Sequence, residues 1–170
     1  MGDPPGFRDF FYFEFARLRD FGYLLTGSWS EAEELAQEAM VRTLQAWPRV
    51  REREDPAIYA RTVLVNRSRT LFRRSKLALR HEMIAGAELS RSPQETVEDR
   101  ALVWSALLRL TRRPRAAIVL RYYEDLSEAQ TAAILGVAVG TVKSLVHKGI
   151  GRLRLELERP ESFQRMGELT

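Results

Sequence analysis

The stretch LSEAQTAAILGVAVGTVKSLVHKGIGRLR, from Leu126 to Arg154, decides the fold of the C-terminal part of the chain. It predicts two helices separated by Gly136, a residue that readily adopts the left-handed turn of such a junction. Ser127 is placed to cap the first helix, with Gln130 as its capping-box partner. The second helix is basic. A helix-turn-helix that enters the major groove of DNA fits this pattern, and so does a plain helical hairpin in a bundle.

Composition limits the classes of protein. The chain has 170 residues, 45% of them hydrophobic, which suffices for one ordinary domain or two small ones. It contains no cysteine, which excludes disulfides and thiolate metal sites and favours a reducing cytoplasm. We find neither a signal peptide nor an apolar run of about 18 residues, the length of a membrane span. We therefore expect a cytoplasmic protein without membrane association.

The order of predicted elements is nearly all helical, because no run alternates apolar and polar residues as a strand would. Helices are expected at 7–25, 32–47 with Ser30 as N-cap, 57–76, 95–110, 113–124, 127–135 and 139–157, with a charged loop after Pro48. Gly, Ser and Pro residues mark a linker between the third and fourth of these helices. The expected fold is all-α, with two small helical domains at 1–77 and 95–158, a flexible linker at 78–94 and a tail at 159–170.

Charge is distributed in blocks. Four glutamates fall between Glu31 and Glu38, and seven basic residues without an acid fall between Arg61 and Arg80. Separate basic blocks with one acidic block indicate a polyanionic partner and a second, basic partner, whereas each block taken alone fits a solvated helix face.

Three stretches resemble one protein family. The run LRYYEDLSEAQTAAILGVAVGTVKS (120–144) resembles region 4 of the extracytoplasmic-function sigma factors of bacterial RNA polymerase, which reads the promoter −35 element. YLLTGSWSEAEELAQEAMVRTLQAW (23–47) resembles region 2.2, and DPAIYARTVLVNRSRTLFRRSK (55–76) resembles regions 2.3 and 2.4. The resemblance covers about Phe7 to Leu157 and implies a non-enzymatic sigma factor that binds core RNA polymerase and directs initiation at promoters with −10 and −35 elements.

The resemblance also implies which residues make contact. Those facing the clamp helices of the largest polymerase subunit are Glu34, Gln37, Glu38 and Val41, and the polymerase flap is a further contact. Those at the −10 element are Arg61, Asn66, Arg69, Arg73 and Arg74, with the 48–56 segment forming a pocket for a flipped base. Those at the −35 element are Thr141, Lys143, Ser144, His147 and Lys148. An anti-sigma factor is a further partner of such proteins, and no cofactor or metal is expected.

Four residues depart from the family pattern. Ala138 stands where a capping Ser is usual, Leu145 where a polar residue is usual, and Gly149 and Gly151 fall inside the recognition helix. These departures keep two alternatives open: a helix-turn-helix regulator that works without polymerase, and a degenerate sigma-like protein that does not initiate by itself. An enzyme is not supported, since we find no nucleophile set, phosphate loop or metal-spaced cluster. The promoter sequence, the regulon and the inducing signal stay open.

Overall fold

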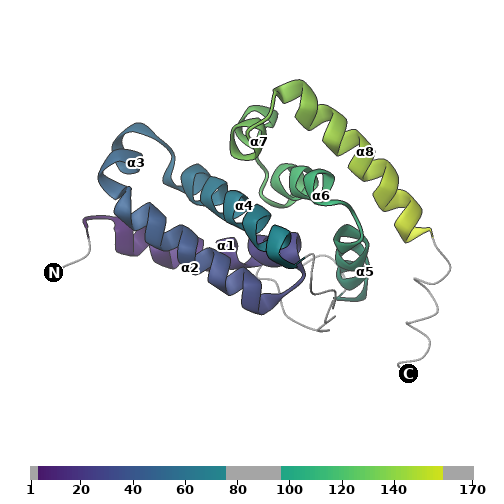
Figure 1. The fold of residues 1–170 in the computed structure, drawn as a ribbon, viewed down its shortest axis with the longest axis horizontal. Coiled ribbons are helices and arrows are strands. Elements are labelled where there is room, and N and C mark those ends of the chain that lie inside the picture. Colours follow the sequence, from purple (N-terminus) through teal and green to yellow (C-terminus); the bar gives the residue numbers. More distant parts are fainter. Residues whose placement is uncertain (1–3, 76–96, 159–170) are drawn as a thin grey trace.

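The computed structural model describes residues 4–75 and 97–158, and these consist of helices and short turns without a strand (Figure 1). The elements are α1 (Phe7–Thr26), α2 (Trp29–Gln45), α3 (Trp47–Arg53), α4 (Pro56–Ser75), α5 (Val97–Leu108), α6 (Arg112–Ile118), the π-helical turn η1 (Val119–Tyr123), α7 (Glu128–Leu135) and α8 (Val139–Leu157). The predicted all-α fold is confirmed. The linker expected at 78–94 and the tail expected at 159–170 lie outside the described residues.

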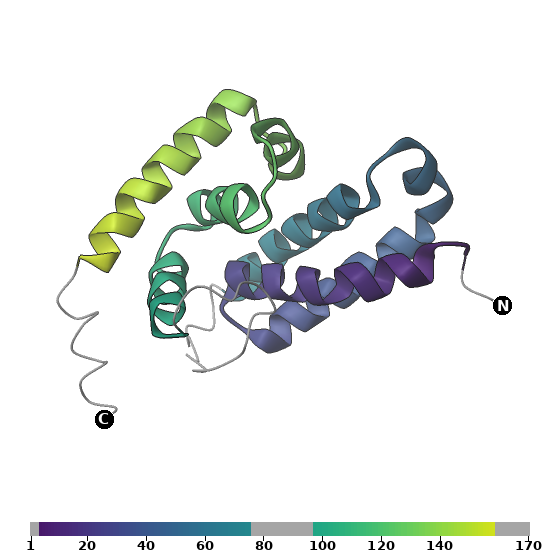
Figure 2. The same ribbon diagram turned by 180° about the vertical axis from the view of Figure 1, so that it is seen from behind.

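The first helical group is a hairpin of α1 and α2 with α4 packed against both, which Figure 2 shows from behind. Leu18, Phe21 and Leu35 are fully buried between these helices. Gly22 lets α1 and α2 approach closely, because a Cβ atom there would lie 3.1 Å from Cα of Ala32. These buried side chains belong to one hydrophobic core that the helices of the first group share.

The start of α2 differs from the prediction. Ser28, not Ser30, is the N-cap: its backbone is extended and its hydroxyl accepts a hydrogen bond from the Glu31 amide at 3.3 Å. The reason is that Gly27, with φ of 76°, ends α1 and turns the chain at once, so α2 begins at Trp29. Ser30 consequently lies inside the first turn, where its side chain does not cap the helix.

The segment after α2 was expected to be a charged loop that begins at Pro48, and it is instead the short helix α3. Pro48 falls in the first turn of α3, where a missing amide hydrogen costs nothing. Trp47 anchors this helix, since its ring packs edge-on against Phe7 at 5.2 Å between centroids. Its indole nitrogen donates to the Pro5 carbonyl at 3.1 Å. This long-range anchor explains why a charged sequence is helical here.

The second helical group contains the predicted helix-turn-helix. Ser127 and Gln130 form the predicted capping box at the start of α7, and Gly136 ends that helix with φ of 66°. The following helix α8 crosses α7 at 96°. Val142 is fully buried at the crossing. No single helix of the described segments is long and apolar enough to cross a membrane, although the bent pair of α7 and α8 meets those two criteria together.

Gly149 lowers the helix propensity of α8, but it also allows a close packing contact. A Cβ atom at this position would lie 2.6 Å from Cδ1 of Ile118 and 3.1 Å from Cβ of Pro114, so the glycine lets α8 rest directly on α6. Gly151 has no neighbour within 4 Å of such an atom among the described residues. The two glycines therefore differ: the first lies in close contact with α6, and the second only lowers helix propensity.

The two helical groups pack on each other. Leu64 and Val65 of α4 belong to the same buried cluster as Leu120 of η1 and Leu135 of α7. Both views show α4 beside α7 and the end of α1 beside α5 (Figures 1 and 2). We call this packing of α4 against η1 and α7 the closed arrangement.

Candidate polymerase and nucleic-acid interfaces

The candidate polymerase-binding residues lie together on one face of α2. Glu34, Gln37 and Val41 are exposed, with 52% of Val41 accessible, and Glu38 is half-buried beside them. Their spacing of three, four and seven residues puts them on adjacent turns, opposite the buried face of Leu35, Ala36 and Ala39. A flat strip of polar residues around one exposed valine suits contact with another helix.

Glu38 connects this strip to α4. Its carboxylate accepts a hydrogen bond from Nε of Arg42 at 2.6 Å and lies 3.0 Å from Nη2 of Arg67. The hydrogen bond from Arg42, with the charge of Arg67 as a smaller cause, holds the pKa of Glu38 below its usual value. Glu38 therefore stays ionised but is already paired, whereas Glu34 makes no ion pair that the structure records.

The candidate −10 residues on α4 are in mixed environments. Asn66 is exposed and accepts a hydrogen bond from Arg69 at 3.4 Å, a long contact. Arg69 is half-buried, and its Nη2 donates to the Leu135 carbonyl of α7 at 2.7 Å. Arg73 and Arg74 belong to α4, but their side chains are outside the described part of the structure.

Arg61 is buried in the closed arrangement, with 4% of it accessible. Its Nη1 donates to a Glu14 carboxylate oxygen of α1 at 2.9 Å, and its Nε donates to Glu124 after η1 at 2.6 Å. Its Nη2 also contacts Glu124. Burial raises the pKa of Glu124, and the charge of Arg61 opposes that rise. In this arrangement Arg61 cannot touch DNA, so its predicted role at the −10 element requires the two helical groups to separate.

The candidate −35 residues share an exposed face at the start of α8, and they are Thr141, Lys143, Ser144, His147 and Lys148. Lys143 lies 3.6 Å from Glu128 across the turn, a loose ion pair at the surface. The helix begins after Ala138, whose backbone is extended and whose side chain makes no cap. The first amides of α8 are thus left without a side-chain partner at the end of the helix that favours anions.

Leu145 is half-buried and packs against the hydrophobic core rather than standing among the polar residues of this face. Its side chain turns inward, toward the core. The exposed face of α8 therefore has one polar residue fewer than the pattern of the family that the sequence resembles.

Sequence reasoning missed the buried charges that join the two helical groups. Glu14 is spaced four and seven residues from the buried Leu18 and Phe21, and Arg61 is spaced three and four from Leu64 and Val65. A charged residue on a buried stripe signals a buried ion pair, so both were detectable. The identity of their partners was not, because Glu124 is 63 residues from Arg61.

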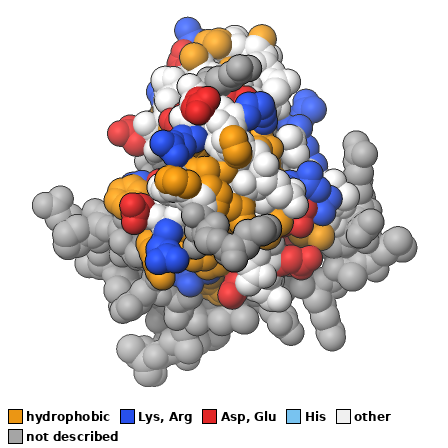
Figure 3. Space-filling view, turned by 90° about the vertical axis from the view of Figure 1, so that its left-hand side faces the viewer, with side chains coloured by type: hydrophobic (Ala, Val, Ile, Leu, Met, Phe, Trp, Pro, Cys, Tyr) orange, Lys and Arg blue, Asp and Glu red, His pale blue; other side chains and the backbone are white. Residues whose placement is uncertain are grey.

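The surface also contains aromatic residues outside these faces. Tyr12 and Phe13 near the start of α1 are 77% and 68% accessible. In Figure 3, which views the end of the molecule with α3, hydrophobic side chains gather at the centre with charged ones around them.

Comparison with known proteins places both helical groups in described families. Residues 16–77 match the family model of sigma-70 region 2, and residues 100–153 match the family model of sigma-70, region 4. An RNA polymerase sigma-E factor of Streptomyces avermitilis is 36% identical over 129 residues, which are 75% of this chain and 72% of that protein. The ECF RNA polymerase sigma factor SigL of Mycobacterium tuberculosis is 34% identical over 142 residues, which cover 79% of this chain and 78% of that protein.

A solved structure resembles the whole arrangement. It is the sigma factor RpoE in complex with the anti-sigma factor NepR from Bartonella quintana, which is 26% identical in sequence. The comparison covers 91% of this chain and 98% of that one with a TM-score of 0.68.

Proposed function

The chain belongs to the sigma-70 family of bacterial RNA polymerase sigma factors, in the extracytoplasmic-function group, and from this we propose which of its surfaces carries out each part of the work. It binds core RNA polymerase and directs promoter-specific initiation of transcription. The observation that supports the assignment best is the separation of charge: an exposed acidic face on α2 and an exposed basic face on α8. A regulator that uses the helix-turn-helix alone is not favoured, since it has no need of the first group.

The strip of Glu34, Gln37, Glu38 and Val41 binds the clamp helices of the largest polymerase subunit, with further contact to the flap elsewhere. Carboxylates at such a rim attract a basic partner and raise the rate of encounter more than the affinity. Glu34 is the best probe of this role, because it is exposed and Glu38 is already paired with Arg42 and Arg67.

The two DNA-binding surfaces lie on α4 and α8. Asn66 offers a donor and an acceptor to a base, while Arg69, Arg73 and Arg74, with Arg61 after the groups separate, hold phosphates of the melted −10 strand. The start of α8 enters the major groove at the −35 element, where Thr141, Lys143, Ser144, His147 and Lys148 make contact. The domains involved are 1–77 and 95–158. The protein performs no catalysis of its own, works in the cytoplasm, and is controlled by a partner of the anti-sigma class.

The test is in vitro transcription with core polymerase on genomic fragments, with mapped start sites. Wild-type protein should give transcripts well above the core-only background. Glu34→Lys should lower the rate of binding to core polymerase by roughly tenfold at low salt, and less at high salt.

The matched control is Glu158→Lys, which reverses an exposed charge at the end of α8, away from α2. It should leave core binding unchanged. Equal loss in both variants would reject the docking face, and absence of any promoter-dependent transcript would reject the function.

A further inference from the structure

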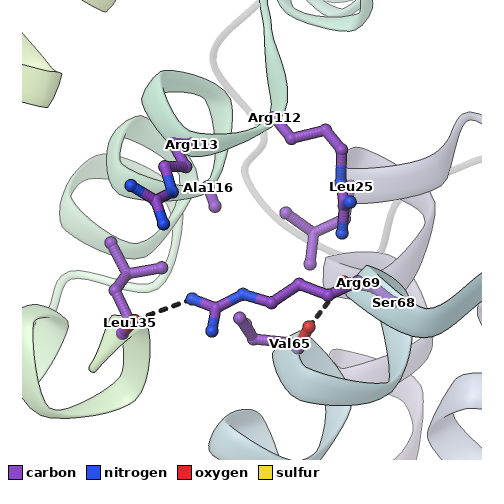
Figure 4. A pocket seen from close by; sticks show the side chains of 8 residues that line it. All are labelled: Leu25, Val65, Ser68, Arg69, Arg112, Arg113, Ala116 and Leu135. Carbon is purple, nitrogen blue, oxygen red and sulfur yellow. Dashed lines mark hydrogen bonds between the residues drawn. The ribbon is translucent and has the colours of Figure 1, made fainter. Parts of the chain in front are cut away.

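Three arginines of α4 have described side chains, and each is held by a different part of the molecule. Arg61 is enclosed between carboxylates of both helical groups, and Arg69 reaches α7, where its Nη2 donates to the Leu135 carbonyl (Figure 4). Arg67 instead lies 3.0 Å from the Glu38 carboxylate of α2. Release of Arg61 and Arg69 therefore requires the two groups to separate, whereas Arg67 is held within the first group.

The partner of Arg67 is one of the candidate polymerase-binding residues. Oε1 of Glu38 accepts a hydrogen bond from Nε of Arg42 at 2.6 Å, and the same oxygen lies 3.0 Å from Nη2 of Arg67. One carboxylate oxygen thus meets two guanidinium groups. Arg42 is one turn away on the same helix, whereas Arg67 reaches across from α4, which packs against α2. This contact joins the polymerase-binding face to the helix that carries the candidate −10 residues.

Both side chains of this contact are partly accessible, 44% for Arg67 and 33% for Glu38. Arg67 also follows the exposed Asn66 directly along α4. An ion pair at the surface contributes little stability, so a competing charge separates it readily. A basic side chain of a docked helix brings a third cation to the same carboxylate and repels the two already there. Arg67 is the partner that this competitor displaces, because Arg42 makes the shorter contact from the same helix.

We propose that Arg67 is a further DNA-binding residue of α4, and that docking of a basic polymerase helix on Glu38 releases it for a phosphate of the melted strand. This inference rests on the proposed function, since it needs Glu38 to face polymerase and α4 to face DNA. A guanidinium group suits a phosphate, because its planar fork can donate two hydrogen bonds. The coupling is reciprocal: a phosphate that draws Arg67 away leaves Glu38 with one cation fewer and favours the docked polymerase.

The first test measures binding of the free full chain to a fluorescein-labelled single-stranded oligothymidylate at low salt, since a phosphate contact does not depend on base sequence. Glu38→Gln imitates the docked state, because it removes the charge that holds Arg67. We expect this variant to bind about threefold more tightly than wild type, a factor within the range of an exposed ion pair. The gain should disappear when Arg67→Gln is added, because no guanidinium group is then released.

The matched control is Glu33→Gln. Glu33 is exposed on the same helix and forms no ion pair with the residues that the structure describes, so its replacement should hardly change the affinity. An equal gain in this control, or a gain by Glu38→Gln that persists beside Arg67→Gln, would overturn the release of Arg67.

The salt dependence of binding identifies the phosphate contact. In the Glu38→Gln background, Arg67→Gln should lower the slope of log affinity against log salt by about 0.7, the value for one phosphate contact to a single strand. A purely structural role of Arg67 predicts weaker binding with the same slope, and that result would contradict the proposal.

The second test uses core polymerase in place of the Glu38 substitution. Arg67→Gln should weaken oligonucleotide binding about threefold more in the complex with core polymerase than in the free chain, because docking releases the arginine only in wild type. Equal weakening in both states would reject the link to docking. Absence of a complex would reject the proposed function together with that link, whereas the free-chain result would still decide whether Glu38 holds Arg67 away from DNA.

Discussion

The two candidate DNA surfaces of this protein differ in how much the rest of the molecule engages them. On α8 the five predicted contact residues are exposed, and Lys143 makes only a loose ion pair. On α4 Arg61 is enclosed by Glu14 and Glu124, and Arg69 donates to the backbone of α7. Two helices that look similarly basic in the sequence therefore differ: the basic side chains of one are exposed, and those of the other are engaged in contacts within the protein. In the closed arrangement the candidate −35 surface is exposed, and part of the candidate −10 surface is occupied by contacts within the protein.

The largest expected effect comes from breaking the buried ion pair. Glu124→Ala leaves Arg61 buried with one carboxylate fewer, and removal of one partner of such a pair costs about 3 kcal/mol. We expect lower stability of the closed arrangement, faster hydrogen exchange in α4, and tighter binding of a single-stranded −10 oligonucleotide. Thermal unfolding, exchange and fluorescence anisotropy measure these quantities.

The matched control for this variant is Arg42→Ala, which breaks the exposed pair with Glu38. A pair of that kind contributes only about 0.3–0.5 kcal/mol, so exchange in α4 should hardly change. If Glu124→Ala behaved like this control, the contrast between the two DNA surfaces would not depend on Arg61.

A second pair of variants tests how α8 packs against α6. Gly149→Ala places a methyl group against Ile118 and Pro114, and overpacking of this kind costs about 1–3 kcal/mol, more than the gain of about 1 kcal/mol in helix propensity. Gly151→Ala meets no neighbour among the described residues and should stabilise the protein by up to about 1 kcal/mol. Chemical denaturation should therefore give free energies of unfolding that change in opposite directions. Two changes of the same sign would contradict the close contact between α6 and α8.

A smaller effect concerns the start of α8. Ala138→Ser supplies the side-chain cap that the helix lacks, and we expect a gain of about 1 kcal/mol in stability. The gain should appear as slower hydrogen exchange in the first turn of α8, with α4 unchanged. Exchange that slows equally in α4 would mean that the two surfaces are coupled more tightly than the contacts indicate.

The smallest expected effect sharpens the description of the −35 surface. Lys148 is exposed on α8, where it is placed to contact a phosphate, so Lys148→Ala should weaken binding of −35 duplexes of any sequence and lower the salt dependence of binding by about one ion. Binding of the single-stranded −10 oligonucleotide should not change. A loss confined to one duplex sequence would instead assign Lys148 to base reading.

What could be predicted from the sequence depended on the range of the interactions. The capping box at Ser127, the turn at Gly136 and the two helices around it were correct because each is set by residues within one or two turns. The N-cap at Ser30 and the loop at Pro48 were wrong because a competing glycine turn and the contact of Trp47 with Phe7 decided those places.

The same distinction applies to the functional residues. The exposed face of α2 fits helical spacing, and the contact residues of α8 came from the family resemblance. The structure places both sets at or near the surface. The burial of Arg61 depends on Glu14 and Glu124, which are 47 and 63 residues away, and the need for Gly149 depends on Ile118 of a different helix. Local pattern does not encode such pairings, although a charge on a buried stripe indicates that one exists.

The bond from Arg69 to the Leu135 carbonyl and the pairing of Arg61 with Glu124 have a quantitative consequence for promoter opening. A guanidinium group that is paired inside the protein cannot bind DNA at the same time. Under the proposed function, the melted strand therefore binds α4 fully only in molecules whose two helical groups have separated. The apparent dissociation constant for that strand equals the intrinsic constant divided by the fraction of open molecules. A partner that shifts this fraction, such as polymerase, therefore changes promoter output. Each 1.4 kcal/mol in the free energy of opening changes it about tenfold, without a change in any residue proposed to contact a base.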